Sequence, residues 1–140
     1  VKPEQLVECC SPSGQLNLMK AMFHPQALRS VIDNWVAVAT VLIRRVHREA
    51  VTAGENSFSH MLFQELLRFP DVRPLWQSNE IETWQAPLLT VTFKAKQQQL
   101  SFFSTLATLG TPYDITLQEL RIECLFPADQ LTADVMHQAI

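Results

Sequence analysis

The chain has 140 residues, of which 47% are hydrophobic and 18% are charged. These values are ordinary for a globular protein, and the length suits a single domain with a proper core. The formal net charge is −3, so the chain lacks the basic patch or stripe that DNA-binding domains usually carry. No apolar run approaches the roughly 20 residues of a membrane span, and no signal peptide is visible.

The residue types that carry chemistry form no familiar pattern. Three cysteines are an odd number without metal-like spacing, and the adjacent Cys9 and Cys10 make a poor disulfide pair, which favours a reducing cytoplasm. There is no GxSxG, HExxH, Walker or dinucleotide motif. His47, His60 and His137 have no Cys or acidic partner at ligand spacing. We therefore expect no enzyme activity, no metal and no cofactor.

Helical periodicity runs through the first half of the chain. Residues Ser30 to Ala50 predict the longest helix, because apolar side chains recur three and four positions apart. Its cations crowd the expected last turns, where positive charge suits the helix dipole. The apolar stripe comprises Ile32, Trp35, Val36, Ala39, Leu42, Ile43 and Val46, and the cations are Arg44, Arg45, His47 and Arg48.

Shorter helices are predicted on either side of this one. Ser57 is an N-cap candidate for the helix that ends before Pro70. The residues that recur in it at helical spacing are Phe58, Met61, Leu62, Glu65, Leu66 and Phe69. Trp76 is expected to pack inward in the next segment, and Ser78–Ala86 form a connector or an early strand. The predicted short helices are Pro3–Val7, Leu16–Phe23, Ser57–Phe69 and Asp71–Gln77.

The second half reads as strands. The run Leu117–Phe126 alternates, with Leu120, Ile122, Cys124 and Phe126 on the expected packed face and Glu119, Arg121 and Glu123 on the wet face. Strands are also predicted over Leu88–Lys94 and Leu100–Leu109, with a loop at Lys96–Gln99 and a terminal helix or tail over Asp129–Ile140. The fold class is therefore α+β, with helices packed on an antiparallel sheet of at least three strands.

Two runs carry a resemblance to a known family. They are MFHPQALRSVIDNWVAVATVLIRRVHREA, from Met22 to Ala50, and LSFFSTLATLGTPYDITLQELRIECLFPAD, from Leu100 to Asp129. Both resemble, in order and at roughly the same spacing, the MmyB-like family of transcription regulators. Together they cover the chain from about Gly14 to Asp129.

The resemblance implies a fold and a function that composition and periodicity do not give. It implies a PAS-like ligand-binding domain that follows an N-terminal helix-turn-helix domain, and fatty acids as the ligand class. The chain starts at Val, and two PAS strands are not visible before Gly14. We therefore expect residues 1–140 to be a single sensor domain from a longer cytoplasmic regulator. It would lack the first two strands and the DNA-binding domain, and an uncovered sheet edge would favour a homodimer.

The polar candidates for ligand binding lie around the first run. His24 can bond a ligand head group or cap a turn through the backbone. Arg29 can grip a carboxylate as a bidentate pair or be an exposed residue with no role. Asn34 can point into a cavity beside Trp35 or bond a neighbouring loop. We expect alanine at Arg29 or Asn34 to weaken acid binding with little change in folding.

The apolar candidates lie on the predicted strands. Phe102, Phe103, Leu106, Leu120 and Ile122, together with Phe126, suit the lining of a cavity between helices and sheet, although a filled core needs the same residues. Three hypotheses are therefore ranked. The first is a sensor of a fatty acid or similar apolar acid, and the second is a dimerisation module with a filled core. A small enzyme ranks last, because no catalytic motif supports it.

Overall fold

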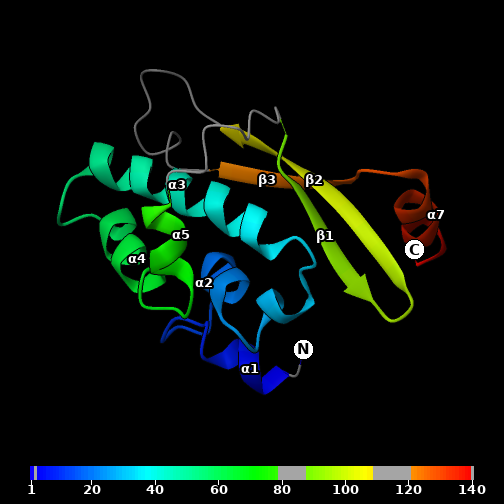
Figure 1. Ribbon diagram of the computed structural model, residues 1–140, viewed down its shortest axis with the longest axis horizontal. Helices are drawn as coiled ribbons and strands as arrows, with labels where there is room; N and C mark the ends of the chain where they lie inside the picture. Colours follow the sequence, from blue (N-terminus) through cyan, green and yellow to red (C-terminus); the bar gives the residue numbers. More distant parts are fainter. Residues whose placement is uncertain (2, 79–87, 109–120, 140) are drawn as a thin grey trace. The chain divides into compact units, whose positions relative to one another are not determined.

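The computed structural model describes residues 1, 3–78, 88–108 and 121–139 (Figure 1). They belong to two compact units, Val1–Gln85 and Ala86–Ile140, and each unit is described by itself. The first unit is helical, and the second contains a three-stranded antiparallel sheet. The predicted α+β class is confirmed.

The first unit is built around one long helix. Helix α3 (Trp35–Ala53) packs along α4 (Phe58–Leu66) and α5 (Val72–Gln77), as Figure 1 shows. Before it come α1 (Pro3–Val7), α2 (Leu18–Phe23) and the 3-10 helix η1 (Leu28–Val31). The buried side chains of α3 are Val38, Ala39, Thr40, Leu42, Ile43, Val46 and Ala50.

The predicted start of α3 was wrong by five residues. The helix begins at Trp35, with Asn34 as N-cap, and Ile32 is extended (φ −86°, ψ 117°). Ile32 is buried, but it belongs to the segment that precedes the helix. It lies three residues before Trp35, a spacing that also occurs along one face of a helix, so it was included in the predicted stripe. Val36, a member of the predicted apolar stripe, is 59% exposed. At the other end Gly54 adopts φ 91°, a conformation that suits glycine after a helix.

Helix α4 begins as predicted, but its spacing does not show which of its apolar residues are buried. Ser57 is the N-cap as predicted, because its side chain accepts a hydrogen bond from His60 N at 3.1 Å. Phe58 and Met61, however, are exposed, whereas Phe63 and Leu66 are buried. Apolar residues lie on several sides of this short helix, so their spacing alone did not identify the buried side.

The second unit is a meander with a helix at its end. Strands β1 (Thr90–Ala95), β2 (Gln98–Thr108) and β3 (Arg121–Pro127) lie in the order β1-β2-β3. Lys96 and Gln97 connect the first two, and Lys96 has φ 52°. The predicted residues 109 and 117–120 of the last two strands lie outside the described part. Neither side of β3 is well covered, since Ile122, Leu125 and Phe126 are 43%, 57% and 44% exposed.

Helix α7 (Gln130–Gln138) is joined to the sheet by a small polar network. Asp129 caps the helix by accepting a hydrogen bond from Thr132 N at 2.7 Å, and this bond lowers the pKa of the carboxyl. The hydroxyl of the buried Thr132 accepts from Ser101 N at 2.9 Å, and Ala128 N donates to Ser101 O at 2.8 Å. The helical alternative for the chain's end is therefore confirmed.

Candidate functional site

Arg29 makes its contacts within the first unit. Its guanidinium donates to Pro70 O and to Asp71 Oδ2, each at 2.7 Å. It also lies over the ring of Trp35, 3.6 Å from the ring centre. The side chain is only 16% exposed. Arg29 is therefore neither an exposed residue nor free of partners, because it joins η1 and the start of α3 to the turn between α4 and α5.

Trp35 and Asn34 lie at the N-terminus of α3 rather than within it. Trp35 Nε1 donates to Met22 O at 3.0 Å, and its ring meets Phe23 edge-on at 6.3 Å. Asn34 is the N-cap, but its side chain makes no capping hydrogen bond. Trp35 thus anchors the long helix to α2.

His24 contacts both the backbone and a carboxylate. Gln26 N donates to His24 Nδ1 at 3.2 Å, so Nε2 carries the proton that is donated to Glu8 Oε2 at 2.9 Å. Its ring also meets Phe69 edge-on at 5.8 Å. The hydrogen bond from Gln26 N is the backbone contact that the turn-capping interpretation of His24 expects. The structure thus gathers His24, Arg29 and Trp35 around the end of α2 and the turn between α4 and α5.

The sheet separates the apolar candidates. Phe102 is paired with Val91 and Pro127, whereas Phe103 is paired with Thr90 and Phe126. Since successive residues of a strand point to opposite faces, Phe102 and Phe103 cannot line the same side of the sheet. Treating them as one surface was wrong.

The remaining apolar candidates divide in the same way. Ile122 is two residues from Cys124 and four from Phe126, so it shares the face of Phe103 and Phe126, whose rings stack at 5.4 Å. Leu120 lies outside the described residues. Leu106 is in β2, but its side chain is not described.

The face that carries Phe102 is the more apolar of the two. The register places Val91, Phe93, Leu100 and Phe102 on it, and the rings of Phe93 and Phe102 meet at 6.1 Å. A hollow of about 470 Å³ continues this face at the hairpin. Half of its lining is apolar (Ala95, Leu100 and Val135) and half is polar (Lys96, Gln97 and Gln98). The opposite face carries Thr90, Thr92 and Ser101 near Phe103, and the Thr92 and Ser101 hydroxyls lie 3.2 Å apart. The Phe102 face therefore presents more apolar side chains than the Phe103 face.

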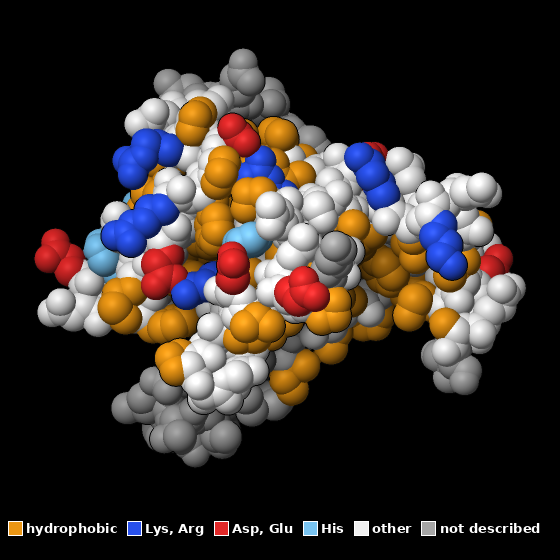
Figure 2. Space-filling view, turned by 90° about the horizontal axis from the view of Figure 1, so that it is seen from below, with side chains coloured by type: hydrophobic (Ala, Val, Ile, Leu, Met, Phe, Trp, Pro, Cys, Tyr) orange, Lys and Arg blue, Asp and Glu red, His pale blue; other side chains and the backbone are white. Residues whose placement is uncertain are grey.

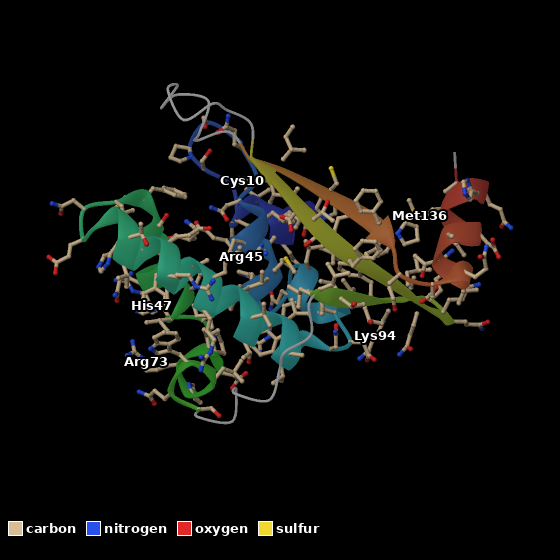
Figure 3. All side chains as sticks on the ribbon, turned by 90° about the horizontal axis from the view of Figure 1, so that it is seen from above. Cys10, Arg45, His47, Arg73, Lys94 and Met136 are labelled. Carbon is tan, nitrogen blue, oxygen red and sulfur yellow. The ribbon has the colours of Figure 1, made fainter. Side chains whose placement is uncertain are left out.

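A second hollow lies in the first unit, where sequence reasoning expected no site. It measures about 350 Å³, and its lining comprises Arg44, His47, Arg48, Val51, Thr52 and Trp76. Figure 3 shows His47 on α3 and Arg73 on α5, the two helices that form it. The only sequence signal was the crowding of cations near the end of α3, which had been assigned to the helix dipole.

The positive charges on one face of the molecule are dispersed. On the face that Figure 2 shows, Lys and Arg side chains lie singly or in small groups and form no continuous stripe. Among the described residues, no group of His, Cys, Asp and Glu is arranged to hold a metal ion. Within the same described part, no helix has the length and apolarity needed to span a membrane.

The negative net charge gives an expectation for DNA. Phosphate contacts supply most nonspecific affinity, and the net charge of −3 opposes them. We expect the 140-residue chain to produce no gel shift with any duplex at physiological salt. A supercoiled plasmid and a short duplex, each assayed over a salt series, provide the measurement. Tight binding that weakens steeply with salt would contradict this expectation.

Comparison with known proteins places the chain in a family. Residues 5–139 match the model of the MmyB-like transcription regulator ligand binding domain. No curated protein and no solved structure gives a significant match. The match covers both units, and it describes a regulator's ligand-binding domain rather than a class of enzyme. The chain therefore belongs to the family of MmyB-like transcription regulator ligand binding domains.

Proposed function

We propose that this chain senses a fatty acid or a similar apolar acid for a DNA-binding transcription regulator. The family match supports a regulatory ligand-binding domain. In this proposal residues 1–140 act as one cytoplasmic sensor domain, and DNA is bound by a helix-turn-helix domain N-terminal to it. A ligand that binds one arrangement of the domain better than another shifts the population toward that arrangement and so biases DNA binding.

The observation that carries the choice of ligand is the apolar face of the sheet. Val91, Phe93, Leu100 and Phe102 share it, and the hollow beside Leu100 continues it. An acyl chain is stabilised by such a lining, whereas a carboxylate must be hydrogen-bonded or remain in water.

The proposed head-group residues are Arg29, Asn34 and His24, beside Trp35. Arg29 uses two of its five N–H donors in the bonds to Pro70 and Asp71, so donors remain for a carboxylate. The contacts with Pro70, Asp71 and Trp35 also hold the guanidinium in one orientation, which reduces the entropy lost on binding.

The two neighbouring phenylalanines of β2 give a matched test. We expect Phe102→Ala to weaken binding of palmitate about tenfold or more, and to lower stability, because it removes lining and packing together. Phe103→Ala removes the same atoms from the opposite face, so it should leave palmitate affinity nearly unchanged. Titration calorimetry with monomeric palmitate measures both, and chemical denaturation reports the stability of each variant.

The outcomes separate the parts of this proposal. Equal loss of affinity in the two variants would contradict the choice of face. Unchanged affinity in Arg29→Ala and Asn34→Ala would remove the head-group assignment but leave the ligand class standing. If the wild-type chain binds no acyl ligand, and no lipid co-purifies from several expression hosts, the sensing proposal fails.

A second candidate function is a dimerisation module, and the exposure of β3 favours it. Ile122, Leu125 and Phe126 are 43%, 57% and 44% exposed, and β3 is an outer strand of the described sheet. A second copy that covers these side chains would bury apolar surface. Light scattering that gives a dimer for the wild type and a monomer for Leu125→Glu, together with no bound lipid, would support this function over sensing.

A further inference from the structure

The cations of α3 have no structural role at the helix end. The helix continues to Ala53, and its last turn contains no basic residue. Because the influence of the helix dipole is confined to the last turn, it does not account for Arg44 and Arg48. These two arginines are also one turn apart on the same helix, where like charges destabilise the helix slightly.

Both arginines line the hollow between α3 and α5. Both are exposed, and neither guanidinium has an ion-pair or hydrogen-bond partner among the residues that the structure describes. Arg45 does not line this hollow, and Figure 3 shows Arg45 and His47 on different sides of α3. The hollow therefore has two unpaired cationic groups at one side, and α3 supplies a neighbouring arginine that lies outside it.

The wall that α5 contributes to the hollow is aromatic and is held by ring contacts. The ring of Trp76 lies 4.4 Å from that of His47 and 5.2 Å from that of Phe63, centre to centre. Phe63 is buried, so these contacts hold the indole against the body of the unit. Val51 adds an aliphatic surface to the same lining. A flat apolar group can pack against this wall, where Arg44 and Arg48 border the same space.

We propose that this hollow binds a small organic anion, with its carboxylate on Arg44 and Arg48 and its flat apolar body against Trp76. Guanidinium groups bind carboxylates through charge-assisted hydrogen bonds, and an aromatic wall adds apolar contact. No residue of the sheet takes part, so the proposal goes beyond the fatty-acid function and is independent of it. A nucleic acid fits less well, since the net charge is −3 and the hollow has a partly aromatic lining.

The test uses 2-naphthoate as the probe and 2-naphthamide as its neutral counterpart. In proton–nitrogen correlation spectra of the whole chain, 2-naphthoate should shift the indole N–H signal of Trp76 in a saturable manner. The signal is assigned with Trp76→Phe. The indole N–H of Trp35, which donates to Met22 O, should not move. The naphthamide should bind about tenfold more weakly or not at all, because it lacks the charge.

Single substitutions that each remove one positive charge identify the groups that hold the carboxylate. Arg44→Gln and Arg48→Gln should each raise the dissociation constant about tenfold, and the double variant should abolish saturable binding. Arg45→Gln is the matched control, since it removes the same charge from the same helix outside the hollow, and it should bind like the wild type. Thermal unfolding of each variant confirms that the fold is retained.

Three results would each overturn the proposal. The first is the absence of a saturable Trp76 shift with 2-naphthoate up to millimolar concentration. The second is equal affinity for 2-naphthoate and 2-naphthamide. The third is an equal change in Arg45→Gln and in the double variant, which would show a general effect of net charge. None of them bears on palmitate binding, which Phe102→Ala tests separately.

Discussion

Alanine in place of Phe23 is expected to lower the free energy of unfolding by about 3–5 kcal/mol, the range for removing a fully buried aromatic ring. Phe23 is completely buried and meets Trp35 edge-on. It ends α2, and its neighbour Met22 accepts the hydrogen bond of Trp35 Nε1. The cavity would therefore open where α2 joins the start of α3. Urea denaturation followed by tryptophan fluorescence and by circular dichroism measures the loss.

Phe58→Ala is the matched control for this substitution. Phe58 is 65% exposed at the start of α4, so the same atoms are removed from a side chain that is mostly in water. We expect a loss below about 1 kcal/mol in this variant. Similar losses in the two variants would contradict the assignment of Phe23 to the core.

Arg29→Ala is expected to cost about 2–3 kcal/mol of stability, the scale of hydrogen bonds to a charged group in a mostly buried position. The variant leaves Pro70 O and Asp71 Oδ2 without their donor and removes the cation from the ring of Trp35. Asp71 has φ 65°, a left-handed conformation that aspartate adopts more often than most residues other than glycine. The sequence alone predicted little change in folding for Arg29→Ala. These contacts predict a loss of stability instead.

Two further variants separate charge from geometry at this position. Arg29→Lys keeps the charge but lacks the planar fork, so it should recover less than half of the loss. Arg68→Ala removes an exposed arginine from the same unit and should have almost no effect. If Arg29→Ala is as stable as the wild type, the contacts with the turn between α4 and α5 contribute nothing to folding.

Local sequence patterns predicted helices and strands well where a single feature, such as an N-cap residue or strand alternation, determined the structure. Ser57 is the N-cap of α4, and the alternation of apolar residues predicted the strands. The start of α3 was missed because Ile32 is buried from an extended segment and sits at a spacing that a helix would also give. In α4, Phe58 and Phe63 are equally hydrophobic, and only packing against α3 and α5 decides which one is buried.

The candidate site was harder to predict because it depends on partners that are distant in sequence. The bonds of Arg29 reach Pro70 and Asp71, some forty residues further along the chain. The hollow lined by Arg44 and Arg48 exists because Trp76 of α5 packs against His47 of α3. The opposite faces of Phe102 and Phe103, by contrast, followed from strand alternation and were available from the sequence.

The bonds of Ser101 have a consequence for self-association. Strand β2 starts at Gln98, and its partner β3 ends opposite Phe102, so the ladder on that side stops before Ser101. There the N–H and C=O of Ser101 bond Thr132 and Ala128 instead, and α7 occupies the place of a further strand partner. At this position the helix therefore prevents a strand of another chain from pairing with β2. Cutting the chain after Pro127 would leave the N–H and C=O of Ser101 without these partners and would lengthen the unpaired edge of β2, which favours pairing with another chain.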